Sequence, residues 1–195
     1  MERFTLTKSA FPDTWQGYKL NTDFHGVLAI LAALNDPELN SADRLMIVRR
    51  RLFADKAPTV TQIMPAFVWF ESCGMERTGG EGGARDFDFE QDAREIYASF
   101  RQVYGIDLMR PLHWWAFSAL LDGVTAAPCA LRDKIQLRHM DDSRAQTDTA
   151  LERAKRAAAI TDAHSLTEKS RDDELRRRLA EGLPFDDLLR EEGEA

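Results

Sequence analysis

The chain has little cysteine and no long hydrophobic run. Its two cysteines, Cys73 and Cys129, lie far apart, without a CxxC motif or a histidine at metal-ligand spacing. They are therefore interpreted as thiols of a reducing compartment, and no zinc site is expected. No apolar stretch approaches the about 20 residues of a transmembrane helix, and the N-terminal sequence MERFTLTKSAF lacks the apolar region of a signal peptide. We expect a protein that stays in the cytoplasm where it is made and has no membrane partner.

Basic residues are also in short supply. The chain has 26 Lys and Arg against 33 Asp and Glu, a net charge of −7. Nucleic-acid-binding proteins usually present a basic face, so no nucleic acid is expected as a partner. The run Arg49, Arg50 and Arg51 is interpreted as the solvated end of a helix, where positive charge complements the helix dipole.

Aromatic residues are almost missing from the last third of the chain. All four tryptophans and all three tyrosines precede residue 118, and Phe185 is the single aromatic after Phe117. Residues 141–195 instead contain ten Lys or Arg and fifteen Asp or Glu. Because aromatic side chains dominate core burial, we predict a helical core domain over residues 1–140 and a charged helical C-terminal arm over 141–195. Four glycines among polar residues predict a mobile linker at 75–86.

The spacing of apolar residues predicts a mainly α fold, with a short extended N-terminal segment or hairpin around RFTLT and GYKLN. Thr22 is the expected N-cap of the first helix, and Asp88 with Gln91 resembles a capping box before the fourth. Pro65 is tolerable near a helix start or at a kink, and Gly74 and Gly105 are expected to end helices. The predicted helices cover 22–36, 41–53, 59–74, 94–105, 112–124, 129–140, 147–163 and 165–182.

The adjacent tryptophans in LHWWAFSALL cannot share one narrow helix face, because neighbouring residues point about 100° apart. Trp114 lies on the apolar arc of this helix with Phe117 and Leu121, whereas Trp115 lies beyond it. Trp115 is therefore covered either by another element of the same domain or by another molecule. The arm carries an apolar stripe one residue wide, which needs a partner surface. The candidate partner-binding residues are Trp115, Leu112, Leu175, Leu179 and Leu183.

Residues able to carry chemistry do not form a known motif. The four histidines, His25, His113, His139 and His164, lie on or beside separate predicted helices, and His113 is best explained as a hydrogen-bonded core or boundary residue. The carboxylates of DFDFEQDAREI are explained by capping of a helix, with a cation site as the alternative. We therefore expect no catalytic, cofactor-binding or metal-binding residues, and no enzymatic activity.

Three blocks together resemble the bacteriophage gene-product-fifteen family: LNTDFHGVLAILAALNDPELN, FDFEQDAREIYASFRQVYGIDL and LHWWAFSALLDGV. They cover residues 20–124 with gaps. The resemblance implies a protein from the tail-morphogenesis region of siphophages and prophages. It further implies a tail-assembly chaperone that coats the tape-measure protein and is displaced as tail-tube subunits polymerise around it.

On this interpretation the partners are the tape-measure protein, with the tail-tube protein as a further partner, and the chain acts in the host cytoplasm. A homo-oligomer is expected, because both Trp115 and the arm would serve contacts between molecules. One alternative is a virion component, such as a head-tail connector or tail-completion protein. A second alternative is an enzyme whose site is assembled from distant residues.

Overall fold

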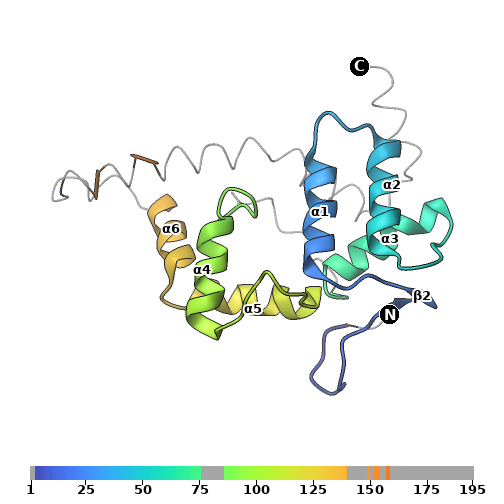
Figure 1. The fold of residues 1–195 in the computed structure, drawn as a ribbon, viewed down its shortest axis with the longest axis horizontal. Coiled ribbons are helices and arrows are strands. Elements are labelled where there is room, and N and C mark those ends of the chain that lie inside the picture. Colours follow the sequence, from blue (N-terminus) through green and yellow to red (C-terminus); the bar gives the residue numbers. More distant parts are fainter. Residues whose placement is uncertain (1–2, 76–85, 140–148, 150–151, 154–156, 159–195) are drawn as a thin grey trace. The chain divides into compact units, whose positions relative to one another are not determined.

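In the computed structural model, the described residues are 3–75, 86–139, 149, 152–153 and 157–158. They divide into two units, each with its own internal contacts. Of the described residues, 3–75 and 111–117 belong to unit 1, and 86–110 and 118–139 belong to unit 2. Figure 1 shows the helices and strands along the chain. The predicted arm lies almost entirely outside the described residues, as does the predicted linker, so the domain boundary at residue 140 stays a prediction.

Unit 1 opens with a small hairpin. Strands β1 (Thr14–Trp15) and β2 (Tyr18–Lys19) pair antiparallel, with Trp15 opposite Tyr18. The connecting Gln16 and Gly17 have φ values of 49° and 85°, the left-handed conformation that a two-residue hairpin turn requires. The extended structure expected at GYKLN is confirmed. The RFTLT segment forms no strand.

Three helices complete the described part of unit 1: α1 (Phe24–Asn35), α2 (Ser41–Leu52) and α3 (Val60–Glu71). Helices α1 and α2 lie side by side, and α2 also contacts α3 (Figure 1). Each helix is 12 residues long and buries an apolar face. The buried residues that define the shared core are Phe24, Val27, Ile30, Leu31, Leu34, Leu45, Val48, Leu52, Ile63, Met64, Ala66, Phe67, Trp69 and Phe70.

The prediction that Thr22 caps α1 is wrong by one residue. Asp23 is the N-cap, and its carboxylate accepts a hydrogen bond from the His25 amide at 3.4 Å. Thr22 instead makes a tertiary contact, because its backbone carbonyl accepts a hydrogen bond from the Trp114 amide at 2.7 Å. The predicted start of α2 at Ser41 is confirmed, with Asn40 as its cap and the three arginines in its last turn.

Helix α3 is largely buried, as its apolar sequence predicts. Pro65 lies inside the helix and is exposed to solvent. Proline has no backbone N–H, so one helical hydrogen bond is missing here, but the carbonyl group that would have accepted it is on the solvent side. Beyond the helix, Cys73 and Gly74 adopt positive φ values of 56° and 69°. The Gly74 amide returns to the Trp69 carbonyl at 2.9 Å, which confirms Gly74 as part of the helix end.

Unit 2 contains α4 (Ala93–Tyr104), α6 (Ala130–Arg138) and most of α5 (Trp114–Ala126), a helix that begins in unit 1. Gly105 ends α4 in the left-handed conformation, as predicted. Ser99, fully buried on α4, accepts a hydrogen bond from the Leu131 amide at 3.1 Å and thereby fixes the start of α6. Among the described residues, no helix combines the length and apolar character needed to cross a membrane.

Candidate functional site

Unit 1 contains an aromatic cluster formed by Trp69, Phe70, His113 and Trp115. Trp115 is 1% exposed, and its ring centroid lies 5.6 Å from that of Trp69 in an edge-to-face arrangement. Its indole N–H donates to the Phe70 carbonyl at 2.8 Å. The neighbouring Trp114 donates to the Glu71 carbonyl at 2.9 Å. Both indoles therefore use their polar atoms on the end of α3, while their rings fill the core.

An N-terminal strap, residues 3–13, lies over the aromatic cluster. Phe4 and Phe11 pack against each other with ring centroids 5.3 Å apart. Phe4 stacks on Trp115 at 6.3 Å, and Phe11 stacks on His113 at 4.9 Å. The Phe4 amide also donates to the Cys73 carbonyl at 3.1 Å. The strap thus contacts Trp115 with both of its phenylalanine rings.

His113 links the strap to α5. The Trp115 backbone N–H can only donate, so His113 Nδ1 accepts it, at 3.1 Å. The Pro12 carbonyl can only accept, so Nε2 carries the proton and donates to it, at 3.1 Å. Burial lowers the pKa of His113 below 6.5, and it outweighs the opposing effects of the Pro12 hydrogen bond and the Asp13 charge. The prediction of a hydrogen-bonded boundary histidine is confirmed.

Within this chain Trp115 is covered by other elements of its own unit, which is one of the two alternatives for this residue. The indole is buried in this conformation, and its use as a partner contact stays a prediction. Trp115 is buried because the strap and α3 cover the side of α5 that the apolar arc leaves out. Leu112 is half-buried, and its carbonyl accepts the Phe24 amide at 2.9 Å. The arm residues Leu175, Leu179 and Leu183 lie outside the described residues, so their role stays a prediction.

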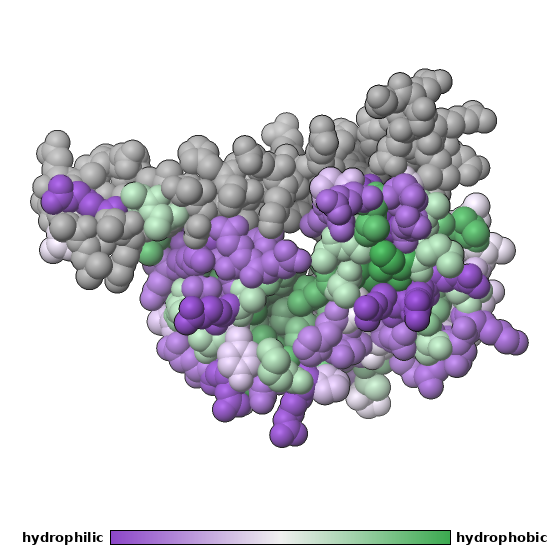
Figure 2. All heavy atoms as spheres, turned by 45° about the horizontal axis from the view of Figure 1, so that its top comes forward, coloured by the Kyte–Doolittle hydropathy of each residue, from purple (hydrophilic) through white to green (hydrophobic). Residues whose placement is uncertain are grey.

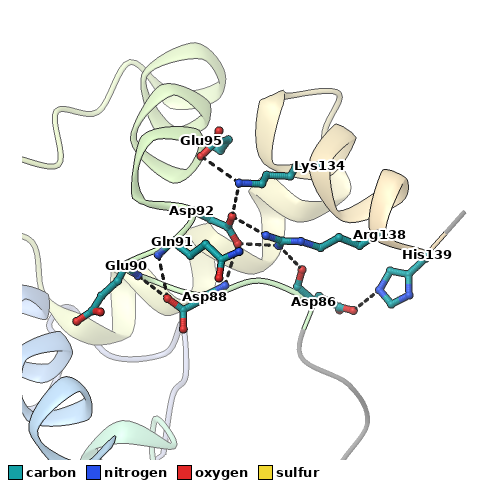
Figure 3. A network of polar contacts seen from close by, with 9 residues as sticks. All are labelled: Asp86, Asp88, Glu90, Gln91, Asp92, Glu95, Lys134, Arg138 and His139. Atoms are coloured by element: carbon teal, nitrogen blue, oxygen red, sulfur yellow. Dashed lines mark hydrogen bonds and ion pairs between the residues drawn. The ribbon is translucent and has the colours of Figure 1, made fainter. Parts of the chain in front are cut away.

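In unit 2, a network of polar contacts joins the start of α4 to the end of α6 (Figure 3). Asp92 is its centre, with a side chain that is 0% exposed. The two terminal guanidinium nitrogens of Arg138, Nη1 and Nη2, donate to the Asp92 carboxylate at 2.7 Å, which gives a bidentate pair between residues 46 positions apart. Lys134, one turn earlier on α6, contacts the same carboxylate at 2.7 Å.

Backbone groups complete the network. The Asp88 amide donates to Asp92 at 2.9 Å, and the Asp88 carboxylate accepts the amides of Glu90 and Gln91, each at 2.9 Å. These two bonds stabilise the turn that precedes α4. The prediction that Asp88 and Gln91 form the capping box of this helix is wrong, because the N-cap of α4 is Asp92. Arg138 also donates to the Asp86 carbonyl at 2.9 Å. Burial alone would raise the pKa of Asp92, but the hydrogen bonds from Arg138, Lys134 and Asp88 outweigh it and lower that pKa.

A cation site is the alternative explanation for the carboxylates of DFDFEQDAREI, and the contacts of this network can be compared with it. The position that a cation would take beside Asp92 is filled by the charged groups of Lys134 and Arg138 (Figure 3). Within the described residues, no three His, Cys, Asp or Glu side chains gather in a way that would hold a metal ion. Cys73 and Cys129 are buried free thiols, and the Cys129 thiol donates to the Val124 carbonyl at 3.2 Å. Sequence reasoning missed the Asp92–Arg138 pair, although Lys134 and Arg138 share one face of α6 at a spacing of four.

The helices, the strap and the network define a mainly helical protein that uses these polar side chains to hold its own elements together. The chain belongs to the Bacteriophage Gp15 protein family, whose model matches residues 14–162. The match extends beyond the resembling blocks at both ends and includes α6. No curated protein and no solved structure matches the chain significantly. Family membership supports a role in phage structure or morphogenesis.

Proposed function

We propose that the protein is a tail-assembly chaperone that binds the tape-measure protein during tail morphogenesis and has no enzymatic activity. The observation that carries the proposal is membership of the Bacteriophage Gp15 protein family over residues 14–162. The three resembling sequence blocks imply a role in tail morphogenesis, and the tape-measure protein is proposed as the partner on that basis. A chaperone of this kind must shield a long apolar helix and then release it, so its contacts have to be apolar but limited in area.

The surface of unit 1 supports this proposal. Helix α1 contains no Asp, Glu, Lys or Arg over its whole length, and Leu28, Ala29, Ala32 and Ala33 on this helix are not buried. Figure 2 shows apolar surface among hydrophilic residues in this part of the molecule. A helix without charge on its exposed side is unusual, because surface helices normally place polar residues there. Such a side suits close packing against another helix.

Exposed methionines support it as well. Among the described residues, the large apolar side chains that are most exposed include Met46 at 57%, Met75 at 60% and Met109 at 73%. Methionine is flexible and polarizable, so it adapts to partner surfaces of varied shape. This property suits a protein that has to bind successive stretches of a long partner whose side chains differ along its length.

Co-expression with the neighbouring tape-measure gene, followed by affinity capture, tests the proposal. Ala32→Glu places a charge on the outward side of α1 and should reduce capture of the tape-measure protein at least tenfold. Ala98→Glu is the matched control, because Ala98 is exposed in the middle of α4 and the chemical change is identical. Circular dichroism should show unchanged helical content for both variants.

Mass spectrometry of purified phage particles provides the second arm. A chaperone is displaced before the tail is complete, so the protein should be absent from finished particles. Stoichiometric presence in particles would instead support the head-tail connector or tail-completion alternative. Failure of the wild-type protein to capture the tape-measure protein would overturn the proposal.

A further inference from the structure

The N-terminal strap is held on unit 1 mainly by two aromatic rings. Its backbone is tied to the unit near its two ends, by the Phe4 amide on Cys73 and by the Pro12 carbonyl that accepts His113. Between these ties the chain stands away from the core, and Leu6 is 90% exposed. Phe4 and Phe11 are half-buried and supply the apolar contact.

The surface beneath the strap is more apolar than the strap itself. Trp115 is 1% exposed, Phe70 is 0% exposed and Cys73 is 3% exposed with the strap in place. Lifting Phe4 and Phe11 would bring the indole of Trp115 into water, at a cost set by the apolar area exposed. The aromatic cluster is therefore stable only when another segment covers it. The strap shows the kind of segment that fits, which is an extended one with two phenylalanines.

The family model matches the aromatic cluster but not the strap. Matching begins at residue 14, so the aromatic cluster lies within the matched region and the strap lies before it. The connection between them is short, since β1 begins at Thr14 immediately after Pro12 and Asp13. The strap is thus joined to the matched region through a short connection at Asp13 and Thr14, and a segment connected in this way can exchange between copies.

We propose that the aromatic cluster also accepts the strap of a second copy of this chain, so that copies associate by exchanging residues 3–13. The second copy carries the one segment whose fit the structure displays, with Phe4 on Trp115 and Phe11 on His113. In an exchanged pair, the strap of one copy makes the same contacts with the aromatic cluster of the other copy. Exchange therefore needs no residues beyond those already in contact. The tethered strap acts at an effective concentration of about millimolar, so exchange grows as copies are brought close together. This inference does not depend on the tape-measure proposal.

A labelled peptide of residues 1–13 tests the site, with fluorescence anisotropy as the readout and the full-length chain as the receptor. The double variant Phe4→Ser/Phe11→Ser weakens the resident strap, so the peptide should bind it at least tenfold more tightly than it binds the wild type. Leu6→Ser is the matched control, because Leu6 lies on the same strap but is exposed, and it should behave as wild type. A peptide carrying the same two serines should bind neither chain.

Light scattering over a range of protein concentrations tests the exchange. Wild type and Leu6→Ser should gain mass with concentration, whereas Phe4→Ser/Phe11→Ser should not. Peptide binding without concentration-dependent mass in the wild type would overturn exchange, and would leave the strap as a cover for its own chain. Absence of peptide binding by a folded double variant would overturn the site itself. If circular dichroism shows that the double variant loses its helices, Phe4→Ser alone replaces it in both measurements.

Discussion

Replacing Asp92 by asparagine should destabilise unit 2 by about 3–5 kcal/mol, the usual cost of removing one partner from a buried ion pair. The Asp92 side chain is 0% exposed and that of Arg138 is 2% exposed, so solvent provides no screening that would reduce this cost. Asparagine keeps the shape of aspartate but turns an NH₂ group toward the guanidinium or the lysine. Arg138 then stays buried without a negative charge beside it, and Lys134 loses the same partner.

The assay is urea unfolding followed by circular dichroism, with Glu95→Gln as the control. Glu95 lies on the same helix and faces the same Lys134, but at 3.9 Å and with 32% of its side chain exposed. Its neutralisation should cost less than about 1 kcal/mol, as for exposed pairs in general. A loss below about 1 kcal/mol for Asp92→Asn, equal to that of the control, would refute the assigned role of the network.

The pH dependence of the same pair gives an independent check. The pKa of Asp92 is lowered in the folded protein, so the unfolded chain binds a proton at a higher pH than the folded chain does. The stabilisation is therefore complete above the unfolded pKa of about 3.9 and is lost as the pH falls through the folded pKa. The difference in unfolding free energy between wild type and Asp92→Asn should accordingly shrink as the pH is lowered below about 4.

Three further predictions concern α5 and its surroundings. A Cβ at Gly123 would collide with the hydroxyl of Tyr104, so Gly123→Ala should cost about 1–3 kcal/mol in the wild type. In a Tyr104→Phe background the same change should stabilise the protein by up to about 1 kcal/mol. If urea unfolding showed that Gly123→Ala stabilises the protein in both backgrounds, the close contact would be contradicted. The lowered pKa of His113 means that stability falls as the pH drops below 6.5, and His113→Gln should flatten the dependence measured between pH 7 and 5. Trp115→Ala should cost about 3–5 kcal/mol in thermal unfolding, whereas a surface-like loss would show that the indole is not part of the core.

Local patterns predicted most of the described helices, because each one carries its own signals. The start of α2 at Ser41 and the ends of α3 and α4 at Gly74 and Gly105 follow from capping and from the left-handed conformation of glycine. The Thr22 assignment failed for a reason outside the helix. The Thr22 carbonyl bonds to Trp114, a residue 92 positions later, and no local pattern contains that contact.

The candidate site was less accessible to sequence reasoning for the same physical reason. Helical spacing correctly placed Trp115 off the apolar arc, but it could not show that Phe4 and Phe11 return to cover it. The Asp92–Arg138 pair likewise joins two helices whose neighbourhood is set by tertiary packing. Local capping accounts for a carboxylate at a helix start, and the spacing of Lys134 and Arg138 on one face of α6 does not show which carboxylate they contact.

The described part of unit 1 is built from two stretches of chain that are separated by a helix of unit 2, and this order has a consequence for synthesis. Helix α3 ends at Glu71, whereas Trp114 to Phe117 follow about forty residues later. At translation rates of about 5–20 residues per second, the growing chain waits about 2–8 s for these residues. During that interval α3, apolar on most sides, lacks the indoles of Trp114 and Trp115, which bond to its C-terminal carbonyls in the folded protein. The nascent protein thus passes through an obligatory half-built stage on the ribosome, when its apolar surface is most open to capture by the chaperones of the translating cell.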